Sequence, residues 1–288
     1  MEFKERTCRA VTTLVREMQY DQLCCKAEEL GFRIDQTWRA PTGEGFKCIS
    51  ASLKVDSEDV LVVVFRSTFG NEEWMEYPRK YWKRKFLVHD GQPVGSKWRL
   101  FALWSFTLDE VWNVAGDVQD ESTVDSVRGR IWRQLNAGKR VWLTGHSKGG
   151  AVATTAAARL VLGDSIDDGA LADPATRRSH DASDLTDKDC LSRLSIFTFN
   201  APLAFSAPLA QVYEEHRAKS GAEHVRFEHR SDRVRMLPAG EGLVHVGHLE
   251  LRGEDLTQDR GVVVGSAVAV AGIITALVSA GKAIVNSH

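Results

Sequence analysis

The chain has 288 residues, of which 43% are hydrophobic and 26% charged, an ordinary globular composition that excludes disordered and collagen-like classes. Its 37 Lys and Arg residues balance 39 Asp and Glu residues to a net charge of −2, so no global positive field recruits nucleic acid. Five cysteines without C-x-x-C spacing fit neither a metal knuckle nor a fully paired disulfide framework, so we expect reduced thiols.

The N-terminal segment lacks the features of an export signal. Charged residues interrupt residues 1–19 every few positions, so the apolar core of about 7–15 residues that such a signal needs is missing. We therefore expect a protein that stays in the cytoplasm or is exported without a classical signal peptide.

The predicted elements alternate between helices and strands. Residues 8–31 carry apolar side chains at spacings of three and four and stop at Gly31, which predicts an amphipathic helix. Short apolar runs predict strands at Val60–Phe65, Val141–Thr144, Leu194–Phe199, Val225–Glu228 and Leu243–Leu251. Helical patterns lie between several of these runs. The order predicts an α/β fold with a mostly parallel central sheet flanked by helices.

Two segments stand apart from this pattern. Residues 163–190 hold eight Asp residues without periodicity, which predicts an exposed insertion; no complete calcium-loop pattern is present, so we expect no metal there. Residues 262–281 contain no charge and have the length of a membrane-crossing helix. We expect one domain over residues 1–255 and an apolar C-terminal helical segment over 256–288, which either associates with a membrane or packs on the core.

The stretch with the clearest chemical meaning is a GxSxG motif around Ser147. It follows the predicted strand Val141–Thr144 and precedes an alanine-rich helix that ends near Leu162. On a tight turn between strand and helix, Ser147 projects its hydroxyl above the sheet edge, and the flanking glycines give the turn room. The alternative is a glycine-rich turn in which Ser147 only caps the helix.

A nucleophilic serine needs a base and an orienting carboxylate, and both follow in the chain order Ser, Asp, His. Asp232 lies just after the predicted strand Val225–Glu228, although neighbouring arginines offer it a purely structural ion pair. His245 follows thirteen residues later. His248 competes for the same role, but it faces the other side of the predicted strand, and we favour His245.

Four blocks in the same order resemble the class 3 (fungal-type) lipase family of α/β hydrolases. Phe65-Arg-Ser-Thr with Trp74 downstream is similar to the family's F-R-G-[ST] segment, and the Ser147 block resembles T-G-H-S-L-G-G-A. Phe197-Thr-Phe-Asn-Ala-Pro resembles T-F-G-x-P. Asp232 to Pro238, followed by His245-Val-Gly, resembles the segments that bear the family's acid and base.

The resemblance implies an α/β-hydrolase fold and a site without cofactor or metal. Ser147 would be the nucleophile, Asp232 the acid and His245 the base, while backbone N–H groups at Thr68 and Lys148 would form the oxyanion hole. Three residues depart from the family pattern: Ser67 and Asn200 replace glycines, and Lys148 replaces an apolar residue.

The implied activity is cleavage of carboxylic ester bonds in lipids, of the triacylglycerol lipase or phospholipase A type, at a lipid or membrane interface. Residues 74–86 interleave five basic residues with aromatics, as a lid at a lipid surface would, although a solvated basic face explains them equally well. Two other interpretations are open. One is a membrane-active or interaction protein with a hydrolase-like body, and the other is an esterase for small soluble esters; no protein partner is indicated.

Overall fold

The computed structural model describes residues 2–17, 26–39, 46–55, 57–68, 100–114, 117–118, 126–162, 188–232, 234–237 and 242–252. Residues 74–86, interpreted as a lid or as a solvated basic face, and the C-terminal segment 256–288 lie outside these ranges, as does most of the predicted insertion 163–190. Within the described ranges, no helix combines the length and apolarity that a bilayer crossing requires.

The described strands form an eight-stranded sheet in the order β10-β8-β6-β5-β3-β2-β1-β4 and a two-stranded sheet of β7 and β9. Strands β3, β5, β6, β8 and β10 run parallel, whereas β1, β2 and β4 pair antiparallel at one side. This mostly parallel sheet confirms the predicted fold class. The strands are β1 (Phe32–Arg39), β2 (Phe46–Val55), β3 (Glu58–Phe65), β4 (Asp117–Val118), β5 (Arg140–His146), β6 (Leu194–Phe199), β7 (Phe205–Ser206), β8 (Glu223–His229), β9 (Leu243–Val244) and β10 (His248–Arg252).

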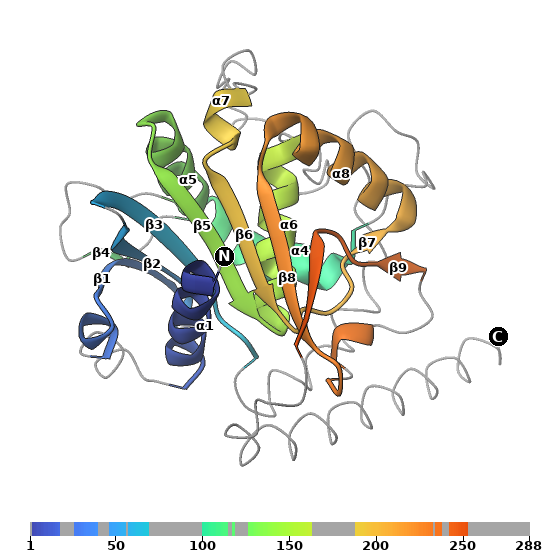
Figure 1. Ribbon diagram of the computed structural model, residues 1–288, viewed down its shortest axis with the longest axis horizontal. Coiled ribbons are helices and arrows are strands. Elements are labelled where there is room, and N and C mark those ends of the chain that lie inside the picture. The colour runs from blue at the N-terminus through green and yellow to red at the C-terminus, as the bar shows by residue number, and fades with distance from the viewer. Residues whose placement is uncertain are drawn as a thin grey trace.

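Helices cover both faces of the large sheet (Figure 1). Helix α1 lies on one face, and α4, α6 and α8 lie on the other. The helices are α1 (Glu2–Glu17), α4 (Ala102–Trp112), α5 (Val127–Asn136), α6 (Lys148–Leu162), α7 (Lys188–Leu191) and α8 (Ala207–Ser220), with a short 3-10 helix η3 at Val234–Met236.

Successive side chains of β3 pack in two different hydrophobic cores, one on each face of the sheet. Leu61 and Val63 pack with the α6 side, and Val62 and Val64 pack with the α1 side. The run Val60–Phe65 is buried throughout, which confirms the prediction of a strand covered on both faces. Because a parallel sheet is covered by helices, its central strands need apolar side chains in both directions.

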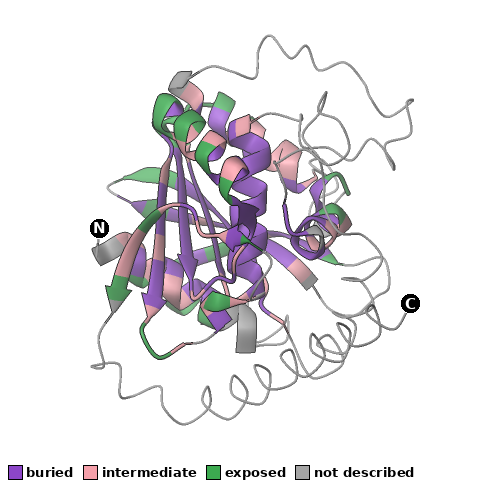
Figure 2. Ribbon diagram, turned by 90° about the vertical axis from the view of Figure 1, so that its right-hand side faces the viewer, coloured by how far each residue is buried: buried purple, intermediate pink, exposed green. Residues whose placement is uncertain are grey.

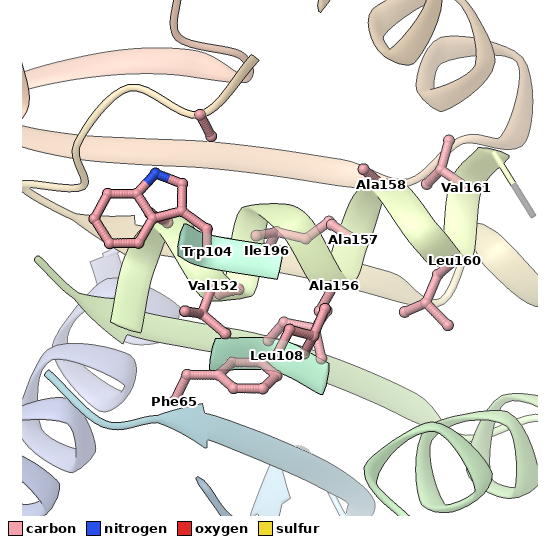
Figure 3. Close-up of a cluster of buried hydrophobic side chains, with 14 of the residues drawn as sticks. Phe65, Trp104, Leu108, Val152, Ala156, Ala157, Ala158, Leu160, Val161 and Ile196 are labelled. Atoms are coloured by element: carbon pink, nitrogen blue, oxygen red, sulfur yellow. The ribbon is translucent and has the colours of Figure 1, made fainter. Parts of the chain in front are cut away.

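Helix α6 packs at the centre of the larger core (Figure 3). Three consecutive alanines, Ala156 to Ala158, are fully buried, and the larger side chains of Val152 and Leu160 pack in the same core. Small side chains let the helix lie close to the sheet on one side and to α4 on the other. Figure 2 shows the result: α6 and the central strands are buried along most of their length.

Two predicted elements differ from the structure. Of the expected helix 8–31, the structure describes α1, which starts earlier, at Glu2, and extends to Glu17, and a helical turn at residues 26–29 just before Gly31; residues 18–25 lie outside the described ranges. The expected strand Leu243–Leu251 is two strands, β9 and β10, because Gly247 has a φ of 84° that breaks an extended chain.

Four described strands were not predicted: the two-residue strands β4 and β7 and the two long strands β1 and β2. Both β1 and β2 mix polar and apolar residues, so neither contains a continuous apolar run. β2 pairs antiparallel with β3, and β1 pairs antiparallel with β2, which completes one side of the sheet. For the cysteines, Cys8, Cys48 and Cys190 are free, as expected, and the other two lie outside the described residues.

A buried histidine joins β8 to α8. His224 Nδ1 lies 2.9 Å from the hydroxyl oxygen of Tyr213, and both side chains are buried. Burial, together with the nearby positive charges of Arg217 and Arg226, lowers the pKa of His224 from 6.5 to about 3. His224 is therefore neutral in the folded protein.

We expect this histidine to make the protein acid-sensitive. Between pH 6.5 and 3 the unfolded chain binds a proton at this position and the folded chain does not, so stability falls as the pH is lowered. From pH 7 to 5 the wild type should lose about 2 kcal/mol more than His224→Gln. Urea unfolding at both pH values measures this difference. Equal losses in the two proteins would contradict it.

Candidate active site

Ser147 sits on a tight turn between the end of β5 and the start of α6. Its φ is 52°, in the left-handed region that non-glycine residues rarely adopt. A Cβ on Gly145 would lie 2.3 Å from the backbone of Gly149, and one on Gly149 would lie 2.1 Å from the carbonyl oxygen of Phe65. Both positions therefore require glycine, and the predicted strand–turn–helix geometry is confirmed.

Backbone hydrogen bonds fix this turn from the neighbouring strand. The N–H of Ser147 donates to the carbonyl oxygen of Phe199, the last residue of β6, at 2.9 Å. The Ser147 carbonyl accepts from the N–H of Gly150 at 2.9 Å, inside the first turn of α6. Strained backbone of this kind persists when the surrounding structure holds it, and it clusters at functional sites.

The two predicted oxyanion donors lie at the ends of adjacent parallel strands. Thr68 follows β3, and Lys148 is the first residue of α6, directly after β5, with its side chain buried. The buried Ser67 hydroxyl ties the two strand ends, since its Oγ donates to the carbonyl oxygen of His146 at 2.6 Å. His146 thus has a structural contact through its backbone. The oxyanion role of Thr68 and Lys148 stays a prediction.

Asp232 lies in the loop after β8, as predicted from its position in the chain. Burial raises the pKa of its carboxyl group, and this effect outweighs the N–H of Val234, which donates to Asp232 Oδ1 at 2.8 Å. Arg235 donates from Nε to the backbone oxygen of Asp232, at 3.2 Å, and not to its carboxylate. Arg235 therefore does not form the alternative ion pair with the Asp232 carboxylate.

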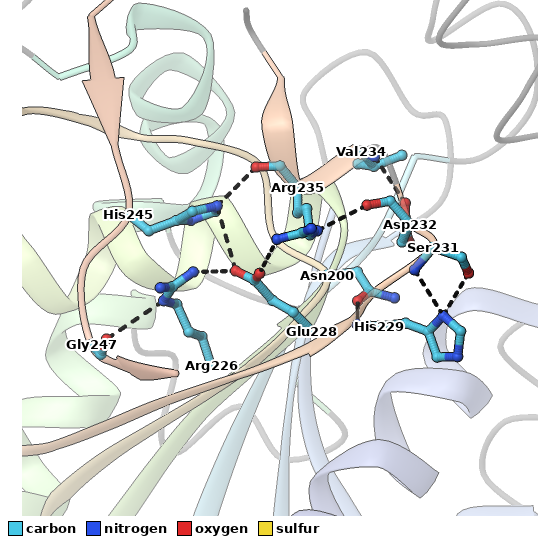
Figure 4. Close-up of polar contacts among 10 residues, drawn as sticks. All are labelled: Asn200, Arg226, Glu228, His229, Ser231, Asp232, Val234, Arg235, His245 and Gly247. Atoms are coloured by element: carbon cyan, nitrogen blue, oxygen red, sulfur yellow. Dashed lines mark hydrogen bonds and ion pairs between the residues drawn. The ribbon is translucent and has the colours of Figure 1, made fainter. Parts of the chain in front are cut away.

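His245 lies between β9 and β10, not within a strand as predicted. Its Nε2 lies 2.8 Å from the carbonyl oxygen of Arg235 and 3.4 Å from Oε1 of Glu228 (Figure 4). Because a carbonyl oxygen only accepts, Nε2 carries the proton and Nδ1 carries the lone pair. Burial lowers the pKa of His245, with Arg226 acting in the same direction and Glu228 against it.

The structure does not join the three predicted triad residues by hydrogen bonds. Among the described residues, Ser147, Asp232 and His245 have other partners, and Glu228 occupies the place beside His245 that we expected for Asp232. The competitor His248 is exposed and pairs with Glu250 at 3.1 Å. The triad assignment therefore stays a prediction. In the described chain, no three His, Cys, Asp or Glu side chains cluster as a metal site.

Residues 62–241, more than half of the chain, match the family model described as lipase (class 3). The chain belongs to the class 3 lipase family. No curated protein sequence matches this lipase.

Several solved structures share the fold of this lipase at low sequence identity. A deletion mutant of Rhizomucor miehei lipase in complex with its propeptide is 19% identical, with a TM-score of 0.55 over 88% of this chain and 67% of that one. Lipase II from Rhizopus niveus is 19% identical, with a TM-score of 0.54 over 87% of this chain and 79% of that one. A triacylglycerol lipase described as having a serine protease triad is 19% identical, with a TM-score of 0.52 over 87% and 78%.

Family membership makes this class 3 lipase a carboxylic ester hydrolase. Two of its departures from the family pattern, Ser67 and Asn200, have structural explanations. Asn200 has a φ of 47°, which asparagine tolerates better than most residues, and its Oδ1 accepts from the N–H of His229 at 2.7 Å. Asn200 therefore ties the end of β6 to the end of β8, as Ser67 ties β3 to β5.

Sequence reasoning missed Glu228, the central residue of the polar cluster in Figure 4. It was assigned only as the end of a predicted strand. The available signal was the alternation of β8, in which His224, Arg226 and Glu228 share one face of a strand that has helices on both sides. Three polar side chains on a covered face indicate a buried network.

Proposed function

We propose that this lipase hydrolyses lipid esters with Ser147 as its nucleophile. The observation that carries the proposal is the strained turn at Ser147, where two glycines that cannot be replaced place a serine between the end of β5 and the start of α6. A serine that only caps a helix does not need this geometry.

In the proposed reaction, His245 accepts the Ser147 hydroxyl proton at Nδ1 while Oγ bonds to the ester carbonyl carbon. N–H groups at Thr68 and Lys148 stabilise the resulting oxyanion, and Asp232 supplies negative charge that favours the imidazolium. The alcohol leaves with the proton from His245. Water then attacks the acyl enzyme, regenerates Ser147 and releases the acid, so no cofactor is needed.

The proposed substrate is a long-chain lipid ester, either a triacylglycerol or a phospholipid, at a lipid interface. Membership in a lipase family supports this substrate class. One structural neighbour is described as a triacylglycerol lipase, which favours glycerol esters of fatty acids as the first substrates to examine. The predicted lid segment 74–86 belongs to the same proposal.

Fluorophosphonate labelling and ester turnover test the proposal together. We expect one phosphonylated residue, Ser147, by peptide mass spectrometry, and faster turnover of long emulsified esters than of short soluble ones. Labelling elsewhere would exclude Ser147 as the nucleophile. Labelling at Ser147 with preference for short soluble esters would support a small-ester esterase and contradict the lipid substrate.

A further inference from the structure

Glu228 is a buried carboxylate surrounded by three basic side chains. Its side chain is 1% exposed, on the face of β8 that lies under α6 and α8. Oε2 accepts from Arg235 at 3.0 Å, and Oε1 accepts from Arg226 and lies 3.4 Å from His245 Nε2. A buried carboxylate persists only when such partners offset its lost hydration.

The partners of Glu228 come from its own strand and from two later segments: Arg226 lies on β8, Arg235 in η3 and His245 between β9 and β10. Arg235, in the loop after β8, also donates from Nε to the backbone oxygen of Asp232. Arg226 also contacts the carbonyl oxygen of Gly247, in the loop before β10, through Nε at 3.5 Å. Figure 4 shows Glu228 at the centre of these contacts, with the Asp232 loop on one side and His245 on the other.

The same contacts define which ring nitrogen of His245 carries the proton. Nε2–H is directed at the Arg235 carbonyl oxygen and the Glu228 carboxylate, so Nδ1 is the nitrogen left to accept a proton. A fixed tautomer and ring orientation are what a neighbouring carboxylate provides to a catalytic imidazole. Here the neighbouring carboxylate is Glu228, and Asp232 makes no bond to His245.

We propose that Glu228 is the positioning residue of this active site, holding His245 in its base tautomer and fixing the Asp232 loop through Arg235. This inference rests on the proposed function, because it gives His245 a role in turnover. It assigns to Glu228 the orienting contact that sequence analysis placed on Asp232.

Removing the negative charge of Glu228 should change the pH dependence of ester turnover in a defined direction. The charged or titratable groups that act on His245 are Arg226, Glu228, Arg235 and His224. Of these, Glu228 raises the pKa of His245, and Arg226 and Arg235 lower it. In Glu228→Gln the imidazolium loses its stabilising partner, so the pKa of His245 and the acid limb of kcat/KM both move to lower pH.

The central experiment compares Glu228→Gln with Glu250→Gln in full-length protein. Glu250 also pairs with a histidine, His248, but on the exposed edge strand β10. We expect kcat of Glu228→Gln to fall about 10- to 100-fold with KM nearly unchanged, because a misplaced base slows the chemical step. Glu228→Asp keeps the charge and should recover part of kcat. Glu250→Gln should match the wild type in kcat and pH profile.

If Glu228→Gln does not fold, a second variant, Arg235→Gln, tests the same role. Arg235→Gln removes the link to Asp232 at a partly exposed position and should show the same loss of kcat. Wild-type kcat in folded Glu228→Gln, or in Arg235→Gln, would overturn the proposal.

An NMR titration of His245 in a Ser147→Ala background tests the contact between His245 and Glu228 without turnover. If the pKa of His245 is the same in Glu228→Gln as in the parent protein, the proposal is also overturned. Wild-type turnover of His245→Ala would instead refute the base assignment in the proposed function.

Discussion

Replacing Ser147 with alanine is expected to reduce ester turnover by about 10⁴-fold or more while the protein stays folded. The hydroxyl forms the bond to the ester carbon, and no neighbouring group replaces it in that step. Alanine retains the Cβ that already fits the turn, whose backbone is held by Phe199 and Gly150. Hydrolysis of a long-chain ester, followed with equal amounts of folded protein, measures the effect.

Ser126→Ala is a matched control for this substitution. Ser126 caps α5, where its Oγ accepts from the N–H of Gly129 at 3.1 Å, and it has no role in the proposed reaction. We expect a stability loss of about 1 kcal/mol with unchanged kcat. If Ser147→Ala hydrolysed lipid esters as fast as Ser126→Ala, Ser147 would not be the nucleophile.

Gly149→Ala should destabilise the protein by roughly 3 kcal/mol or more and abolish turnover. The new methyl group would lie 2.1 Å from the Phe65 carbonyl oxygen and 2.9 Å from its carbon, and both are backbone atoms of the central strand β3. A backbone contact of this kind is relieved only by moving β3 or α6. Either movement displaces Ser147 from the end of β3, which leads to Thr68. Urea unfolding and ester turnover measure the two effects.

Gly31→Ala is a control that measures the cost of replacing a glycine where the new methyl group contacts no other atom. Gly31 has a φ of 79°, but no atom lies within 4 Å of the Cβ it would gain. The expected loss is therefore only that of the left-handed backbone, about 1–2 kcal/mol, with turnover unchanged. If Gly31→Ala and Gly149→Ala lost similar free energies of unfolding, the close approach of Gly149 to β3 would not require glycine.

Some features of the fold were predictable because their causes are local. The β5–Ser147–α6 unit depends on a short apolar run, two close glycines and an alanine-rich helix, all within about 25 consecutive residues. The strands at Val60–Phe65 and Leu194–Phe199 were predictable for the same reason. The first is a continuous apolar run and the second is mostly apolar, as a doubly covered parallel strand requires.

Other features depended on contacts between distant residues. Strands β1 and β2 have no periodicity strong enough to predict them, and the pairing of β2 with β3 and of β1 with β2 defines them. The division between β9 and β10 depends on the left-handed backbone of Gly247, which packs against the ring of His224, 23 residues earlier in the chain. Neither contact leaves a pattern in a short window of sequence.

The amino-acid sequence by itself determined the α/β fold class, the position of the serine turn and the lipase family, because each follows from short runs of residues with fixed spacing. Only the tertiary structure decided which carboxylate lies beside His245. Glu228 and Asp232 are four residues apart, and both follow the expected chain order. The direction of a strand face and the path of the following loop place Glu228, not Asp232, against the imidazole.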